Sequence, residues 1–250
     1  MNLLIVDEPS ARLVFPLSDH RSVHLRRVLR AGPGSVVRIG CTDGPVGRGI
    51  VRSIDSATVI DVAWNSVPLP RPTVALAVGH PRPPVLGRLL RDLATIGVDH
   101  IAVFVGALSE RGYLASSVWC DAPALLRRGL EQGEHTNLPT ISRHESIAGA
   151  LAAIQRVAAD RPAEAVIRLA AHRGAEPAMS AARAVRSGAY HLLCVGPERG
   201  LTAAELDALD RTGYQRVELG SATLRTEIAA NLLCSLAAMS GAPAGHTRDR

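Results

Sequence analysis

The sequence predicts an α/β protein in two parts, a small β-rich domain (residues 1–67) followed by a domain built on a parallel sheet (72–242). From residue 73 onward, apolar runs of strand length alternate with segments whose apolar residues recur at helical spacing, which is the pattern of helices around a parallel sheet. Before residue 67, short strand-like runs are separated by turn residues, as in a small barrel. Between the two parts lies Ser66–Pro72, which is too rich in proline for regular structure and suits a domain boundary.

The composition is that of a globular protein, with 47% hydrophobic and 20% charged residues among 250. Only 3% of the residues are aromatic, so the sequence shows no stacking surface for single-stranded nucleic acid. The net charge is +5 and the chain contains no lysine, which excludes P-loop and Schiff-base lysine chemistry. The basic excess permits an RNA partner without requiring one.

The cysteines and the N-terminus indicate where the protein resides. Cys41, Cys120, Cys194 and Cys234 are far apart, so neither a zinc site nor a disulfide framework is expected. The first ten residues contain too short an apolar run for a signal peptide. No stretch approaches the roughly 20 apolar residues of a membrane span. We therefore expect a soluble, cytoplasmic protein with reduced thiols, no bound metal and no contact with a membrane.

The β-rich domain is expected to hold five short strands and one basic helix. The strands are predicted over residues 3–6, 12–15, 35–40, 47–53 and 57–63, and the helix over 22–29, ended by Gly32-Pro33-Gly34. His24, Arg26, Arg27 and Arg30 lie on or beside this helix. They form either a solvated basic face or a surface that contacts the phosphates of RNA, and both interpretations remain open.

The second domain is expected to alternate strands and helices up to a loose polar tail at 243–250. Asp121 is the expected cap of a helix over 123–132, and Ser142-x-x-Glu145 and Thr202-x-x-Glu205 are read as capping boxes. The strands are predicted over 73–79, 101–105, 166–171 and 192–195, and the other helices over about 86–97, 142–159, 178–187, 202–213 and 226–239.

The segment Leu192–Ala230 carries the features of a binding site. It contains two glycine-bearing loops that follow apolar strands, so both lie at the carboxyl end of a parallel sheet, where such sheets bind ligands. Gly196, Gly200 and Gly220 allow the main chain to approach a ligand closely. Glu198, Arg225 and Glu227 place charges beside these glycines. The charges either act on a substrate or form a structural pair, Arg225–Glu227 or Arg225–Glu198, that only shapes the loop.

Two stretches of this segment resemble a known family. GPERG (Gly196–Gly200) and LGSATLRTEIAA (Leu219–Ala230) resemble the GPEGG and LG-x-x-ILRTETA motifs of the RsmE family, which are ribosomal-RNA uridine-N3 methyltransferases of the SPOUT superfamily. The resemblance extends in order along almost the whole chain. The other stretches that resemble the family are HLRRVLRAGPG (His24–Gly34), Ala94–Val98, Ser109-Glu110-Arg111 and Glu131-Gln132.

The resemblance implies a fold, a cofactor and an assembly. It implies a SPOUT-type parallel sheet with a C-terminal trefoil knot, a pocket for S-adenosylmethionine, a PUA-like β-barrel that holds RNA, and a homodimer. By this resemblance the cofactor would be held by the backbone around Gly196, Pro197, Glu198, Gly200, Leu219, Gly220 and Leu224.

The same resemblance suggests roles for the charged residues. Uridine N3 loses a proton when it is methylated, so Glu227 or Glu198 would accept the proton, and Arg225 would stabilise the charge that spreads to the pyrimidine oxygens. The residues expected to contact substrate are His24, Arg26, Arg27, Arg30, Arg111 and Arg199.

The sequence also departs from the family pattern at polar positions. Arg199 stands at the second glycine of GPEGG and Ile228 at a threonine, and Thr95, His135 and Asp92 are further departures. Three functions remain open. The first is N3-methylation of a uridine in 16S ribosomal RNA from the small subunit. The second is methylation of a different RNA or a small-molecule acceptor, and the third is RNA binding without catalysis.

Overall fold

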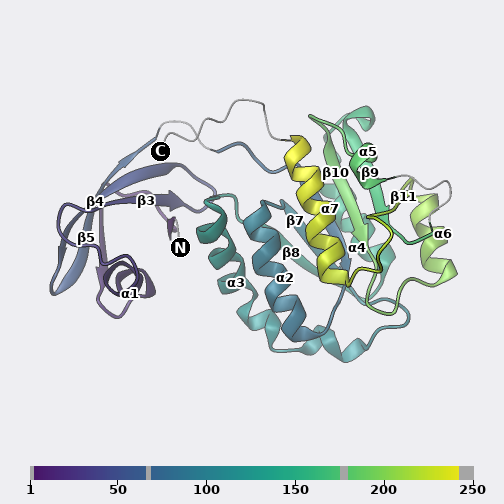
Figure 1. Cartoon of the computed structure of the whole chain (residues 1–250), viewed down its shortest axis with the longest axis horizontal. Helices are drawn as coiled ribbons and strands as arrows, with labels where there is room; N and C mark the ends of the chain where they lie inside the picture. The colour runs from purple at the N-terminus through teal and green to yellow at the C-terminus, as the bar shows by residue number, and fades with distance from the viewer. Residues whose placement is uncertain (1–2, 66–68, 175–179, 242–250) are drawn as a thin grey trace.

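The computed structural model describes residues 3–65, 69–174 and 180–241. Three predicted segments fall partly or wholly outside the described residues. They are the start of the linker (66–68), the start of the predicted 178–187 helix and the whole tail at 243–250. The described chain forms two sheets, joined by the proline-rich segment (Figure 1).

The N-terminal sheet is a curled half-barrel of five strands. Its order is β1-β3-β4-β5-β2, with β1 parallel to β3 and the other pairs antiparallel. Helix α1 (His20–Arg27) begins two residues before the predicted helix, because the Asp19 side chain caps it by accepting from the Arg21 amide. The strands are β1 (Leu4–Val6), β2 (Arg12–Pro16), β3 (Val36–Cys41), β4 (Val46–Ile54) and β5 (Ala57–Trp64).

The second sheet has six strands, all parallel, in the order β11-β9-β10-β6-β7-β8. Every residue of β6 (Val74–Gly79) and of β10 (Tyr190–Val195) is buried, as expected of central strands covered on both faces. The predicted α/β class and the predicted parallel sheet are confirmed. The other strands are β7 (His100–Phe104), β8 (Thr140–His144), β9 (Val166–Ala171) and β11 (Gln215–Val217).

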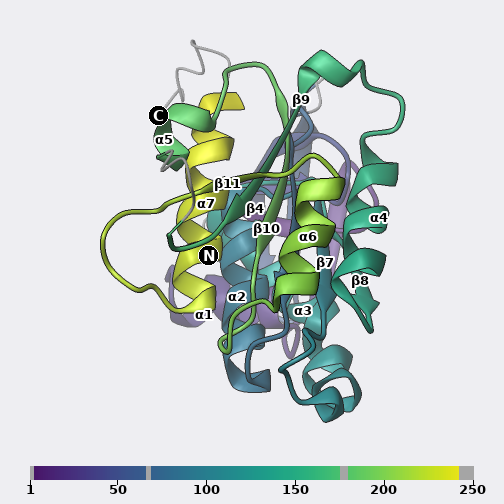
Figure 2. The same cartoon turned by 90° about the vertical axis from the view of Figure 1, so that its right-hand side faces the viewer.

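Helices cover both faces of this sheet (Figure 2). One core is formed with α2 (Pro83–Ile96), α3 (Val118–Gly133) and α7 (Thr226–Gly241). The other is formed with α4 (Ile147–Val157) and α6 (Ala203–Arg211). The remaining helical segments are α5 (Ala181–Ala184) and the 3₁₀ turns η1 (Arg111–Ala115) and η2 (Ala163–Ala165). Among the described residues, no helix combines the length and the apolar character needed to cross a bilayer.

Of the three predicted helix caps, two are wrong and one is confirmed. Ser142 does not cap a helix, because it lies in β8, and α4 is instead capped by Ser146, which accepts from the Gly149 amide. Asp121 lies in the first turn of α3, which begins at Val118 and contains Pro123. The capping box of Thr202 and Glu205 is present with both of its hydrogen bonds.

The half-barrel is fixed against the parallel-sheet region by paired contacts. Leu3 and Ile5 pack on Leu130 of α3. The Asp43 amide donates to the Thr136 carbonyl at 2.7 Å, and the Thr136 hydroxyl donates to the Gly44 carbonyl at 2.9 Å. These bonds hold α1 at the end of the molecule opposite α6 and β11 (Figure 1).

Candidate functional site

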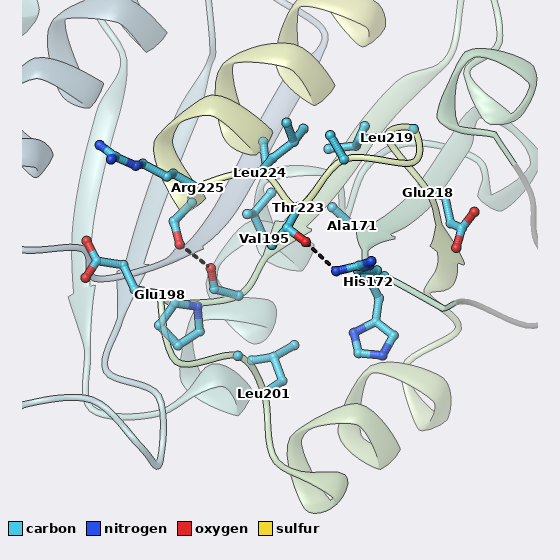
Figure 3. Close-up of a pocket in the computed structure, with 18 of the residues that line it drawn as sticks. Ala171, His172, Val195, Glu198, Leu201, Glu218, Leu219, Thr223, Leu224 and Arg225 are labelled. Atoms are coloured by element: carbon cyan, nitrogen blue, oxygen red, sulfur yellow. Dashed lines mark hydrogen bonds between the residues drawn. The ribbon is translucent and has the colours of Figure 1, made fainter.

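A pocket of about 610 Å³ lies at the carboxyl ends of β9, β10 and β11 (Figure 3). Three chain segments, each leaving one of these strands, form most of its wall. This is the position at which parallel sheets bind ligands. The lining residues are Arg82, Ala171–Arg173, Val195–Glu198, Gly200, Leu201, Glu218–Gly220, Ala222–Thr226 and Ala229.

The first loop, residues 196–202, is shaped by close packing around Pro197. A Cβ built on Gly79 would lie 2.2 Å from the Pro197 nitrogen, and one built on Gly106 would lie 2.8 Å from the proline ring. The loop then turns at Gly200, whose φ is +78° and whose amide donates to the Pro197 carbonyl at 2.9 Å. Glycine adopts such a conformation at little steric cost, whereas most other residues are strained by it.

The second loop, residues 218–225, connects edge strand β11 to α7. Gly220 has a φ of +120°, and nothing lies within 4 Å of the position that a Cβ would occupy there. The Thr226 hydroxyl, at the start of α7, donates to the Gly196 carbonyl at 3.0 Å. This hydrogen bond joins the ends of the two glycine-bearing loops. The sequence predicts that both loops belong to one site.

A third segment, residues 171–174 after β9, completes the wall and was missed by the sequence analysis. The Arg173 guanidinium donates to the Thr223 hydroxyl of the second loop, and the Gly174 amide donates to Glu218 Oε1 at 3.0 Å. Burial lowers the pKa of His172, and the nearby positive charge of Arg216 lowers it further. The position of β9 was predicted correctly, so the rule that ligands bind at carboxyl ends of parallel strands could have found this segment.

Two of the three predicted catalytic side chains line the pocket. Glu198 and Arg225 extend toward the same side of it, away from His172 and Glu218 (Figure 3). Glu198 Oε1 lies 3.7 Å from Arg82 Nε, and the Glu198 side chain is 40% exposed. Glu227 is half-buried on the first turn of α7 and is not among the lining residues. Among the described residues, neither structural pair considered for Arg225 is present as an ion pair within 4.0 Å.

All seven residues expected to bind a cofactor line the pocket, whereas the residues expected to contact substrate do not. Arg199 Nη1 donates to the Leu108 carbonyl at 3.3 Å. Arg111 is exposed at the start of η1. His24, Arg26 and Arg27 lie on helix α1, and Arg30 follows the helix. His24 is half-buried, and the three arginines are exposed. The structure therefore separates the basic helix from the pocket (Figure 1).

The thiols near the pocket are not available as nucleophiles. Cys194 on β10 and Cys234 on α7 are fully buried, and burial raises the pKa of each thiol. A protonated, buried thiol is a poor nucleophile. Within the part of the chain that the structure describes, no group of three or more metal-ligating side chains is placed to hold a metal ion. The polar groups of the pocket are therefore carboxylates, guanidinium groups, the His172 imidazole, two threonine hydroxyls and main-chain atoms.

A parallel sheet with a ligand-sized pocket at the carboxyl ends of its strands is the architecture of an α/β enzyme. Residues 68–238 match the family model described as RNA methyltransferase domain, and the chain belongs to this family. The prediction of an RsmE-like RNA methyltransferase is confirmed.

Two curated relatives match over most of their length. The chain is 28% identical over 228 residues to ribosomal RNA small subunit methyltransferase E of Treponema pallidum, covering 89% of this chain and 84% of the relative. It is 24% identical over 234 residues to ribosomal RNA small subunit methyltransferase E 1 of Borreliella burgdorferi, covering 92% and 94%.

Solved structures share the fold along nearly the whole chain. The ribosomal RNA small subunit methyltransferase E of Neisseria gonorrhoeae, bound to S-adenosylmethionine, has a TM-score of 0.70 at 19% identity and covers 96% of each chain. A methyltransferase of Legionella pneumophila, also with bound S-adenosylmethionine, has a TM-score of 0.74 at 17% identity and covers 96% of this chain and 98% of its own.

Proposed function

We propose that this protein transfers a methyl group from S-adenosylmethionine to N3 of a uridine in 16S ribosomal RNA of the small subunit. The observation that carries the proposal is the pocket itself, because the two glycine-bearing loops and all seven residues expected to bind cofactor meet there. The names of the curated relatives support small-subunit ribosomal RNA as the substrate class.

The pocket fits the proposed cofactor in size and lining. Its volume of about 610 Å³ lies within the roughly 300–1,000 Å³ typical of small-molecule sites. Leu201, Leu219 and Leu224 provide apolar surface for a planar base, and the main chain at Gly220 is open to a ligand. When bound, S-adenosylmethionine supplies an electrophilic methyl group on a positively charged sulfonium.

Glu198 is the better placed of the two carboxylates to accept the N3 proton. It lines the pocket and is partly exposed, whereas Glu227 lies outside the lining. The Nε atom of Arg82 lies 3.7 Å from Glu198 Oε1. Arg225 lines the same side and would stabilise the negative charge that develops on the pyrimidine oxygens as the proton leaves. Glu227 remains the alternative proton acceptor.

The half-barrel is proposed to bind the RNA at a point distant from the base that is methylated. Arg26, Arg27 and Arg30 are exposed together at the end of α1, and guanidinium groups suit phosphate contacts. Because the half-barrel is fixed to the parallel-sheet region by main-chain hydrogen bonds, these arginines would bind RNA at a set distance from the pocket. Arg111 and His24 are proposed as further RNA contacts.

The C-terminal region is proposed to be threaded as a trefoil knot. Strand β11 lies at one edge of the sheet, while α7, the next element, packs on the central strands β6 and β10. The loop between them therefore crosses the end of the sheet, and Thr226, where the loop enters α7, is bonded to the 196–202 loop. This crossing supports the knot expected from the family resemblance.

A homodimer is proposed to form through α7. Ile228, Leu232 and Met239 are 49%, 38% and 77% exposed and lie on one face of this helix. Their exposure on one face supports the proposal that a second copy of the chain packs there. The same helix contributes Thr226 and Ala229 to the pocket, so a second copy of the chain on this face would lie beside the site.

Methylation of defined RNA tests the proposal. The protein would be incubated with labelled S-adenosylmethionine and small-subunit ribosomal RNA transcribed in vitro, alone and in reconstituted subunits, and the RNA digested to nucleosides. We expect the label in 3-methyluridine. Label in another nucleoside would support RNA methyltransferase activity but exclude uridine N3 as the methylated atom. Binding of S-adenosylmethionine without any methylation of RNA would contradict the proposal that RNA is the acceptor.

A different acceptor is the second candidate, and one observation favours it. Ile228 stands where the family motif has threonine, so the first turn of α7, next to the pocket residue Thr226, lacks a hydroxyl at this position. The same assay performed with unrelated RNA and with a small-metabolite extract distinguishes the two candidates. Label that appears only in those samples supports the second.

A further inference from the structure

A short turn after β7, residues 106–110, is fastened to the pocket loop by a buried carboxylate. Glu205 on α6 is 8% exposed. Its Oε1 accepts from the Ala107 amide at 2.9 Å, and its Oε2 accepts from the amide and the hydroxyl of Thr202 at 2.8 and 2.9 Å. One side chain therefore joins the 106–110 turn to the end of the 196–202 loop.

Two other residues of the 196–202 loop contact the same turn. Arg199 Nη1 donates to the Leu108 carbonyl at 3.3 Å. Pro197 fills the space beside Gly106, where a Cβ would lie 2.8 Å from the proline ring. Pro197 also lines the pocket. The loop thus has two sides, one toward the pocket and one toward the turn.

We propose that Glu205 is a positioning residue that holds the 106–110 turn against the outer side of the pocket loop, so that the turn presents Arg111 to an RNA acceptor. Arg199 assists through its bond to Leu108. The turn leads directly into Arg111 at the start of η1, so its position sets where that guanidinium lies. Because Glu205 binds the turn and the pocket loop at once, the two move together. This inference rests on the proposed function, since it assigns the turn to an RNA acceptor.

Two conservative substitutions distinguish a positioning role of Glu205 from a contribution to folding stability alone. Glu205→Gln leaves one acceptor oxygen, which cannot accept from both Ala107 and Thr202, and places an N–H₂ group against an N–H donor. Thr202→Ala is the matched control, because it weakens the cap of α6 but leaves the Ala107 bond in place. A purely structural role for Glu205 predicts the same consequences for both variants.

The first readout needs neither cofactor nor RNA. Hydrogen exchange at the Ala107 amide is expected to become about tenfold faster in Glu205→Gln, the effect of losing one hydrogen bond to a charged acceptor. It is expected to stay unchanged in Thr202→Ala. Arg199→Ala is expected to give a smaller increase, about threefold, because its bond to Leu108 is longer and exposed.

The second readout is methyl transfer to small-subunit ribosomal RNA transcribed in vitro. We expect Glu205→Gln to raise KM for RNA about tenfold, while the Kd for S-adenosylmethionine stays within about threefold of wild type. Faster Ala107 exchange and a higher RNA KM in Glu205→Gln alone would support positioning. Unchanged exchange, or equal effects of Glu205→Gln and Thr202→Ala, would overturn it. If the wild-type protein methylated no RNA, the proposed function would fail, and the exchange data would still decide whether Glu205 holds the turn.

Discussion

The pocket at the end of the parallel sheet is walled largely by main chain and apolar side chains, whereas the end of helix α1 presents arginines to solvent. A pocket wall formed by main chain requires close packing with its neighbours, so one added methyl group can close the pocket. A set of exposed cations acts additively and is screened by salt. The two regions should therefore respond to mutation in different ways: the pocket to single changes of shape, and the helix to the number of charges removed.

The largest effect is expected from Gly79→Ala. The new Cβ would meet main-chain atoms of Pro197 at 2.2 and 2.6 Å, so the pocket loop must shift. We expect a loss of about 3 kcal/mol of folding free energy and loss of S-adenosylmethionine binding, measured by denaturant unfolding and calorimetry. Gly112→Ala is the control, because nothing lies within 4 Å of the position of its Cβ. Cofactor binding by Gly79→Ala at wild-type affinity would show that the pocket does not depend on this fit.

The second effect is on turnover. Glu198→Gln keeps the shape of the side chain but removes the proposed proton acceptor, so kcat is expected to fall about 100-fold. The Kd for S-adenosylmethionine should change little, because the main chain at this position, which is proposed to contact the cofactor, is unaltered. Glu227→Gln tests the alternative acceptor in the same assay. A large fall in kcat for Glu227→Gln, with Glu198→Gln near wild type, would reverse the assignment.

The third effect is on RNA affinity and its salt dependence. Replacing Arg26, Arg27 and Arg30 by alanine together should reduce the slope of log K against log salt by about 3, because each arginine is proposed to bind one phosphate. Arg211→Ala, an exposed arginine on α6, should leave the slope unchanged. An unaltered slope in the triple variant would mean that these arginines form only a solvated face.

The contrast between local and distant signals explains which features the sequence could predict. The glycine loops were found because glycine at a turn and apolar strands before it are local signals. His172 and Arg173 were missed because nothing within their own segment marks them, and they join the site only through the position of β9. Arg82 likewise reaches the pocket from the start of α2, far away in sequence.

Errors in the fold arose where two local patterns competed. Ser142 and Glu145 have the spacing of a capping box, but Ser142 belongs to the half-buried edge strand β8, and its hydroxyl contacts His100 and His144 instead. Asp121, a residue type favoured at helix caps, predicts a helix that starts near Pro123, but Asp121 lies inside the first turn of α3. Packing of α3 against α2 extends the helix five residues earlier.

The smallest effect is expected on the outer face of the half-barrel, where Asp61 bonds two arginines. Hydrogen bonds from Arg12 and then Arg52 lower the pKa of Asp61 from its ordinary value of 3.8 to about 2. A lowered carboxyl pKa stabilises the folded state above the ordinary value, and this contribution is lost as pH falls toward the folded value. Asp61→Asn should therefore flatten the acid side of the stability curve between about pH 4 and 2. Asp55→Asn, an exposed carboxylate in the β4–β5 turn, is the control, and thermal unfolding across this range is the measurement.

The most direct test of the account is equilibrium binding of S-adenosylmethionine to the wild-type chain, measured by calorimetry beside Gly79→Ala and Gly112→Ala. The account predicts one site per chain, retained in Gly112→Ala and lost in Gly79→Ala. Absence of binding to the wild-type chain, or equal binding by all three proteins, would contradict the claim that the two loops form the cofactor pocket.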